Sequence, residues 1–180
     1  MKKLALNKAF TLIEPGPLAL VTTADGGRRN VMTISWMMVM DFTPRFAMLT
    51  GPWNYSCNAL LKTRECVIAL PGAELLRAAV RVGTCSGRET DKFARFGLTP
   101  LPARLVKAPL IKECIANIEC RVVDHIKDHD IFVLDAVAAW TDGKPVAGRM
   151  VHAVGDGTFV LDGRRVNHRR LMSPRLPPGL

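Results

Sequence analysis

The chain has 180 residues, of which 48% are hydrophobic and 23% are charged, and its net charge is +9. These values exclude a disordered or fibrous protein and indicate one domain with a core of ordinary size. No apolar run approaches the roughly 18 residues that a membrane-spanning helix needs, so we expect no membrane partner.

The first half of the chain predicts a hairpin, a third strand and a short helix. The hairpin pairs an apolar run (18–23) with the strand NVMTISWMMVM (30–40), across the turn Asp25-Gly26-Gly27. PRFAMLTG (44–51) predicts the third strand. NYSCNALLKTREC predicts the helix, with Asn54 or Ser56 as its cap.

The second half predicts two further helices and a return to strands. A short buried strand (66–71) precedes an amphipathic helix (73–83), and Ser86 and Glu89 have the spacing of a capping box for the next helix. Alternating apolar residues predict strands from Ile115, over 131–140 and over 157–163. Six or more strands with hairpin connections favour an antiparallel sheet, which closure into a barrel would free of exposed edges.

The amino terminus and the cysteines bear on location. MKKLALNKAF begins like a signal peptide, but Asn7 and Lys8 interrupt its apolar part, and we expect a mature cytoplasmic protein. The five cysteines include no C-x-x-C pair, which favours buried, reduced thiols over a zinc or redox site.

The positive charge is concentrated at the carboxyl end. Residues 162–180 contain five arginines and one aspartate. We therefore expect one domain over 1–162 and a basic, proline-containing arm over 163–180. An anionic partner is suggested, but the scarcity of aromatic residues near basic ones disfavours nucleic acid.

Two stretches have the character of a phosphate site. One is the helix start near Tyr55 and Ser56, and the other is SGRETDK, which combines a hydroxyl, a glycine and Lys92 near a helix start. Helix amino termini present free N–H groups that suit a phosphate. The alternative is that these residues are only helix caps beside a surface lysine. Neither a phosphate-binding P-loop nor a G-x-G-x-x-G fingerprint is present.

The segment DHIKDHD (124–130) places His125 and His129 four residues apart among aspartates. On a helix this spacing would suit a metal. Apolar residues in the flanking sequence alternate with a period of two, however, which is typical of strands. This favours a solvated hairpin turn over a metal site. A serine hydrolase is equally disfavoured, because no G-x-S-x-G motif is present.

Four stretches stand in a familiar order: PGPLALVTTADGGRRNVMTISWMMVMDFTP, NYSCNALLKTRECVIALP, SGRETDKFARFGL and DHDIFVLDAV. Over residues 15–160 the chain resembles the flavin reductase-like, FMN-binding split-barrel family, and within it most the flavoredoxins. The resemblance implies a mainly β fold, namely a six-stranded antiparallel split barrel with short flanking α-helices. It also implies a homodimer with FMN near the subunit interface.

The resemblance also implies which residues contact the cofactor, although it implies no catalytic residue. They come from the second predicted strand, the segment after the third strand, the S-G-x-x-x-x-K-F element and two later positions: Asn30, Met32, Thr33, Ser35, Trp36, Tyr55, Ser56, Ser86, Lys92, Phe93, His129 and Phe159.

The function expected from this resemblance is that of a flavin-dependent oxidoreductase. It would be either a flavoredoxin-type electron carrier with a redox partner protein or a flavin reductase using NAD(P)H. A second hypothesis is a non-catalytic sensor or storage module that binds flavin or haem on the same barrel. A third is association with nucleic acid through the arginine-rich arm.

Overall fold

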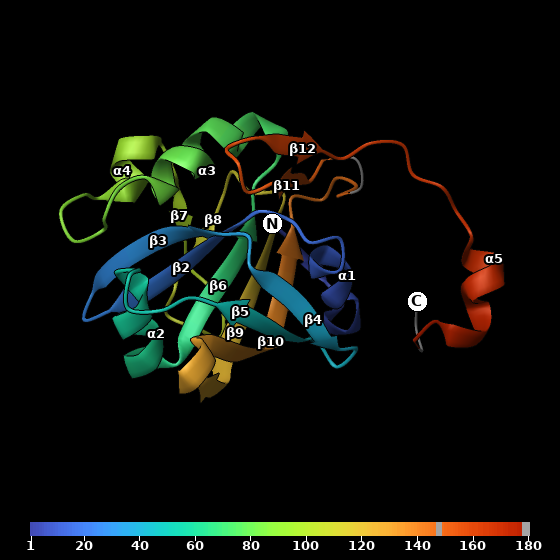
Figure 1. Ribbon diagram of the computed structural model, residues 1–180, viewed down its shortest axis with the longest axis horizontal. Coiled ribbons are helices and arrows are strands. Elements are labelled where there is room, and N and C mark those ends of the chain that lie inside the picture. Colours follow the sequence, from blue (N-terminus) through green and yellow to red (C-terminus); the bar gives the residue numbers. More distant parts are fainter. Residues whose placement is uncertain (147–148, 178–180) are drawn as a thin grey trace.

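The computed structural model describes residues 1–146 and 149–177 and is built around one antiparallel sheet (Figure 1). The main sheet has the order β3-β2-β6-β9-β10-β5-β4, and β1 pairs with the end of β10. Two separate hairpins pair β7 with β8 and β11 with β12. The strands of the described chain are β1 (Lys2–Leu4), β2 (Ala19–Asp25), β3 (Arg28–Ile34), β4 (Met37–Asp41), β5 (Arg45–Leu49), β6 (Glu65–Leu70), β7 (Pro100–Leu101), β8 (Leu110–Ile111), β9 (Ala116–Ile126), β10 (Ile131–Thr141), β11 (Val151–Ala153) and β12 (Phe159–Leu161).

The two ends of the main sheet, β3 and β4, follow one another directly in the chain. The sheet therefore curves round on itself, and the fold is the expected mainly β, antiparallel split barrel. Its main sheet has eight strands where six were expected. One reason is that the 30–40 run is two strands. The N–H of Met37 donates to the carbonyl of Ser35 (3.1 Å), so the backbone turns there and β4 pairs with β5 while β3 pairs with β2.

Short helices flank the barrel. They are α1 (Phe10–Ile13), α2 (Ser56–Thr63), α3 (Leu76–Gly83), α4 (Lys92–Phe96) and α5 (Arg169–Met172), with 3-10 turns η1 (Leu6–Lys8), η2 (Ala73–Leu75), η3 (Lys127–His129) and η4 (Ser173–Arg175). In Figure 1, α3 and α4 lie together at one end of the barrel, and α2 lies beside β2.

Two expected helix caps are wrong. The cap of α4 is Asp91, whose Oδ1 accepts the N–H groups of Phe93 (3.0 Å) and Ala94 (3.2 Å). The hydroxyl of Ser86 instead accepts the N–H of Arg88 (3.1 Å) in the preceding turn. Helix α2 begins after Tyr55 without a side-chain cap, because the Ser56 hydroxyl bonds elsewhere.

The sheet buries both faces, which explains its nearly continuous apolar strands. Val21, Ile68 and Ile118 point into the barrel, where they pack with Phe46 and Phe132. The alternate residues pack outward against α3 and α4, in a second cluster that includes Leu20, Ala69, Val82 and Phe93. Full burial of each large side chain contributes about 1.5–3 kcal/mol, so this outer cluster holds α3 and α4 beside β3.

Beyond the barrel, residues 163–177 run out as an exposed arm that includes α5 (Figure 1). The final residues of the expected arm, 178–180, lie outside the described residues. All five cysteines are free thiols, and four of them are buried. Within the described chain, no helix combines the length and apolar character required to cross a bilayer.

Candidate functional site

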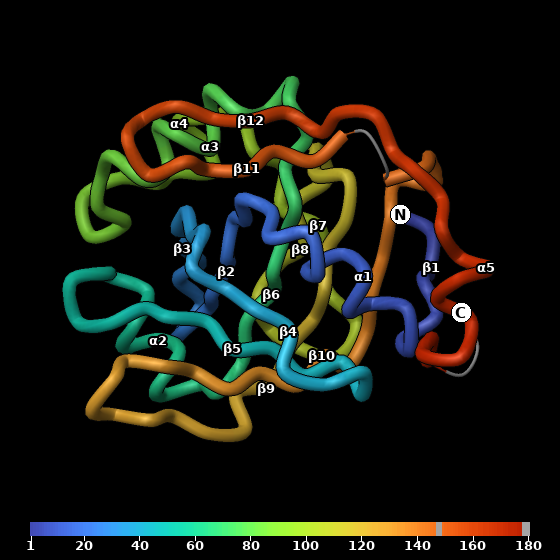
Figure 2. Tube along the Cα trace, turned by 45° about the vertical axis from the view of Figure 1, so that its right-hand side comes forward, coloured from blue at the N-terminus to red at the C-terminus, as the bar shows by residue number. Residues whose placement is uncertain are grey.

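The residues of greatest chemical interest surround a pocket of about 280 Å³ beside β3. Two loops form its other walls: the loop before α2 and the loop between α3 and α4. Figure 2 shows both loops projecting on the side of the molecule where β3 lies. The lining residues are Asn30, Met32, Thr33, Trp53, Asn54, Tyr55, Val82, Gly83, Thr84, Cys85, Ser86, Gly87 and Lys92.

A buried polar chain connects β2, β3 and α2 at the base of this pocket. The Nδ2 of Asn30 donates to the Ser56 Oγ (2.8 Å), and the Thr23 hydroxyl donates weakly to the same oxygen (3.4 Å). All three side chains are buried. Because the Ser56 hydroxyl is fixed by these bonds, the first turn of α2 is anchored to the barrel directly behind Asn30.

Lys92 is the most unusual residue of the site, because only 5% of its surface is exposed. Its ammonium donates to the carbonyl of Val82 (2.8 Å), and no carboxylate pairs with it among the described residues. Burial lowers the pKa of Lys92 below that of an ordinary lysine, while nearby Cys85 acts in the opposite direction. An ammonium has three N–H donors, so this buried cation retains capacity for an anion at the pocket.

The loop between α3 and α4 approaches β3 at a glycine. A Cβ built at Gly87 would collide with the carboxamide of Asn30. Any side chain at residue 87 must therefore displace either the loop or Asn30. Displacement of Asn30 would also break its hydrogen bond to Ser56. The absence of a side chain here is what allows the loop to close over the strand.

A Gly87→Ala variant is therefore expected to bind the ligand of this pocket about tenfold more weakly and to lose about 1–3 kcal/mol of stability through overpacking. Calorimetric titration and urea unfolding measure the two effects. Gly163→Ala is the matched control, because a Cβ at Gly163 meets no atom within 4 Å. Equal affinities in the two variants would contradict the role given to Gly87.

Tyr55 stands at the mouth of the pocket between two cations. The guanidinium of Arg28 lies 5.2 Å from the centre of its ring, and that of Arg88 lies 5.9 Å from it. Arg28 also donates to the carbonyls of Gly87 and Arg88. These contacts attach the loop to β3 and place positive charge at the pocket entrance.

The structure brings six of the residues expected from sequence around this pocket: Asn30, Met32, Thr33, Tyr55, Ser86 and Lys92. Ser56 lies directly behind Asn30. Phe93 is buried in the outer core cluster beside Lys92, and the Arg29 guanidinium covers its ring at 5.2 Å.

Four expected residues lie elsewhere within the single chain. Ser35 and Trp36 are exposed at the junction of β3 and β4, and Trp36 borders a shallow apolar pocket with Met38, Ala47 and Ile131. His129 is exposed in η3, and Phe159 on β12 packs against the outer core cluster.

The pocket also contains residues that sequence reasoning missed, notably Trp53, Asn54, Cys85 and Gly87. Asn54 was considered only as a helix cap, whereas its Nδ2 donates to the Thr50 hydroxyl (3.0 Å). Gly87 follows Ser86 inside a recognised motif, and its glycine identity was the available signal for close backbone approach.

The histidines of the segment 124–130 lie apart, one in β9 and one in η3, and among the described residues no group of three or more His, Cys, Asp or Glu side chains is placed to hold a metal ion. His125 lies in β9 and stacks on Phe132, with ring centroids 4.2 Å apart.

The site offers a buried cation, hydroxyl and amide groups, two arginines against the ring of Tyr55 and the exposed indole of Trp53. This combination suits a ligand that has both an anionic group and a flat ring system.

Comparison with known proteins matches the chain to a family model and to curated relatives. A family model described as "flavin reductase like domain" matches residues 13–157. An uncharacterized protein of Archaeoglobus fulgidus is 37% identical over 124 residues, which cover 64% of this chain and 70% of the relative. The uncharacterized protein YddH of Escherichia coli is 30% identical over 178 residues, covering 89% of this chain and 94% of the relative.

Solved structures share the fold. An FMN-binding domain of a flavin reductases-like enzyme from Shewanella baltica has a TM-score of 0.84 at 23% identity, covering 92% of this chain and 95% of that one. Flavoredoxin of Desulfovibrio vulgaris has a TM-score of 0.77 at 26% identity, with coverage of 84% and 89%. An FMN-binding protein from Thermus thermophilus has a TM-score of 0.74 at 23% identity, with coverage of 84% and 89%.

Proposed function

Because the chain belongs to the flavin reductase like domain family, we propose that it binds FMN in the pocket beside β3 and transfers electrons through it. The observation that supports this proposal best is the buried ammonium of Lys92, which has no carboxylate partner in the described chain. A buried cation is costly unless an anion compensates it. The phosphate or the anionic edge of a flavin would supply that compensation.

The other residues of the pocket have matching roles in this proposal. Asn30 and Thr33 hold polar groups beside the ligand, and Met32 supplies apolar contact on the same strand. The two arginines that flank Tyr55 favour negative charge beside it. A bound flavin would supply the electron-transfer chemistry, and the protein would bind it, orient it and tune its potential.

The electron donor distinguishes a flavin reductase from a flavoredoxin-type carrier. Anaerobic stopped-flow mixing of the FMN-loaded protein with NADH and with NADPH measures whether either one reduces the flavin. Reduction by one of them supports a flavin reductase, whereas reduction only by a protein donor supports a flavoredoxin-type carrier. A loaded protein that no donor reduces would contradict the redox proposal and leave a flavin-binding module.

We also propose that the protein is a homodimer, which an apolar strip on the β4 edge supports. Trp36, Met38, Met40 and Phe42 are all large, apolar and exposed there, with 66% of Trp36 and 60% of Met38 accessible. Such a strip on an edge strand marks an interaction surface. The pocket is also slightly smaller than most sites for ligands of this size, and a second subunit would enlarge it.

If the wild type forms a dimer through this strip, the Met38→Asp variant is expected to be monomeric, because it places an unpaired charge in an apolar interface. Light scattering coupled to gel filtration measures the mass of each species. Leu171→Asp is the control, since Leu171 lies on the exposed arm and 78% of its surface is accessible. A monomeric wild-type protein would contradict the dimer.

We propose a cytoplasmic location. The free cysteines are compatible with a reducing compartment, where disulfide bonds are rare.

A further inference from the structure

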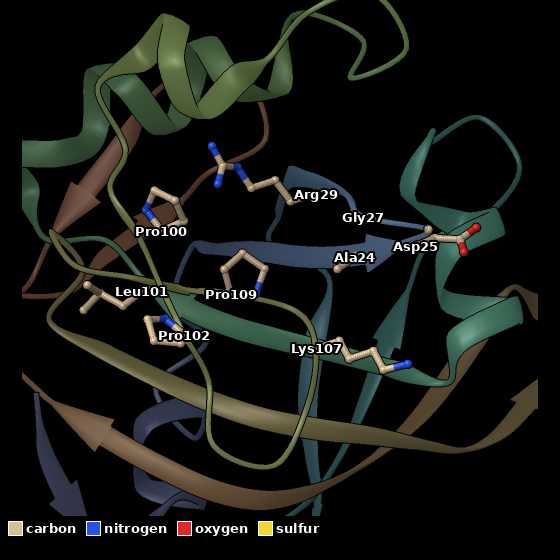
Figure 3. A pocket seen from close by; sticks show the side chains of 10 residues that line it. Ala24, Asp25, Gly27, Arg29, Pro100, Leu101, Pro102, Lys107 and Pro109 are labelled. Carbon is tan, nitrogen blue, oxygen red and sulfur yellow. The ribbon is translucent and has the colours of Figure 1, made fainter.

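A second pocket, of about 390 Å³, lies between the β2–β3 turn and the segment 100–109. Figure 3 shows Arg29 extending from β3 towards Pro100, while Lys107 leaves the opposite wall on the side where Asp25 lies. The pocket shares no lining residue with the candidate flavin pocket.

The wall formed by 100–109 is held in place by hydrogen bonds to the barrel. The Thr22 hydroxyl donates to the carbonyl of Pro109 (2.6 Å), and the N–H of Lys107 donates to the Glu65 carboxylate (3.0 Å). The buried Glu119 carboxylate accepts three consecutive N–H groups of residues 104–106. A loop fixed in this way presents a pocket formed in advance, so a ligand would incur little cost in ordering it.

The pocket carries uncompensated positive charge. Its one carboxylate, Asp25, is paired with Lys62 at 2.8 Å. Within the described residues, neither the Arg29 guanidinium nor the Lys107 ammonium forms an ion pair with a carboxylate, and the Arg29 guanidinium lies over the ring of Phe93. Figure 3 shows the Lys107 side chain directed away from Arg29, so Arg29 is the cation beside Pro100 and Lys107 adds positive charge at the opposite rim.

The rest of the lining is apolar and stiff. Three proline rings and one leucine side chain form it: Pro100, Leu101, Pro102 and Pro109. The turn glycines Gly26 and Gly27, both with positive φ, leave the rim free of side chains. Proline rings offer flat apolar surfaces with little side-chain entropy to lose.

We propose that this pocket is a second ligand site, which binds a small organic anion with a planar apolar body. Arg29 holds the carboxylate or phosphate of the ligand, Lys107 adds positive charge at the opposite rim, and the proline rings cover the apolar face of the ligand. The site operates independently of the flavin pocket and takes a different class of ligand.

The test uses benzoate as the probe, with inorganic phosphate and benzyl alcohol as its charge-only and apolar-only counterparts. Saturation-transfer NMR titrations give the dissociation constant of each probe with the full-length protein, in the presence and absence of excess FMN. Benzoate is expected to bind more tightly than either counterpart, and FMN is expected not to displace it.

The double variant Arg29→Ala/Lys107→Ala is expected to bind benzoate about tenfold more weakly, because it loses the charge-assisted contact of Arg29 and the positive charge of Lys107. The matched control, Arg95→Ala/Lys112→Ala, removes the same two charges from exposed positions outside the pocket and is expected to bind as the wild type does. Thermal unfolding verifies that both double variants fold. The proposal is overturned if the two variants bind benzoate equally, if either counterpart binds as tightly as benzoate, or if FMN displaces it.

Discussion

A Lys92→Met variant is expected to bind FMN about ten- to a hundredfold more weakly than the wild type. The lost interaction is a charge-assisted bond in a nearly water-free position, which contributes about 1.5–3 kcal/mol. Methionine has similar length and no charge, so it retains the packing of the Lys92 chain against the outer core cluster. Fluorescence titration with FMN measures the loss.

The stability of the same variant separates a binding role from a structural one. The substitution removes one hydrogen bond, to Val82, but also relieves the burial of a charge, so the free energy of unfolding without flavin should change by no more than about 1 kcal/mol. Urea unfolding of the flavin-free protein measures this. A large loss of stability with unchanged affinity would show that Lys92 is structural only. The exposed Lys112→Met serves as the control.

The lowered pKa of Lys92 also gives the binding a pH dependence. Burial disfavours the ammonium, so the folded protein without ligand loses this proton at a lower pH than the ordinary value of 10.5. An anionic ligand binds the protonated form. The affinity of the wild type for FMN should therefore decline as the pH rises towards 10.5, and the Lys92→Met variant should lack this decline.

The second large effect is expected at Glu119, where Glu119→Ala should destabilise the fold by about 4–5 kcal/mol. The carboxylate is completely buried in β9. It accepts the N–H groups of residues 104–106, at 2.6–3.2 Å, and the indole N–H of Trp140 at 2.7 Å. Alanine would leave all four N–H donors without a protein acceptor, and such unpaired buried donors are costly.

Urea unfolding of Glu119→Ala, compared with Glu119→Gln, measures this effect. Glutamine retains one acceptor oxygen, so it should lose about half as much stability and supplies a folded variant if alanine prevents folding. The control is Glu89→Ala, which alters an exposed carboxylate and should change stability by less than about 0.5 kcal/mol. A loss below about 1 kcal/mol for Glu119→Ala would contradict the importance of this carboxylate.

Much of the barrel is readable from the sequence because its signals are local. Asp25-Gly26-Gly27 predicts a hairpin turn, and both glycines have positive φ as such turns require. The alternation over β9 and the apolar run over β10 likewise correspond to paired strands. Very short strands such as β1, β7 and β11 carry no periodic signal, because two or three residues contain no pattern to recognise.

The site was predictable only in part, since its assembly depends on tertiary contacts. The resemblance to a family indicated Asn30 and Lys92, but not that the Gly87 backbone closes over Asn30. The capping box at Ser86 was wrong because Asp91, nearer the helix, supplies a competing acceptor. Whether Ser86 or Asp91 caps α4 depends on the path of the loop between α3 and α4, which is set only in the folded chain.

The most direct test of the central claim is a fluorescence titration of the flavin-free protein with FMN. The account predicts saturable binding of one FMN per chain with a dissociation constant in the micromolar range or below, weakened in both Lys92→Met and Gly87→Ala. Absence of binding at micromolar FMN, or equal affinity in the wild type and both variants, would contradict it.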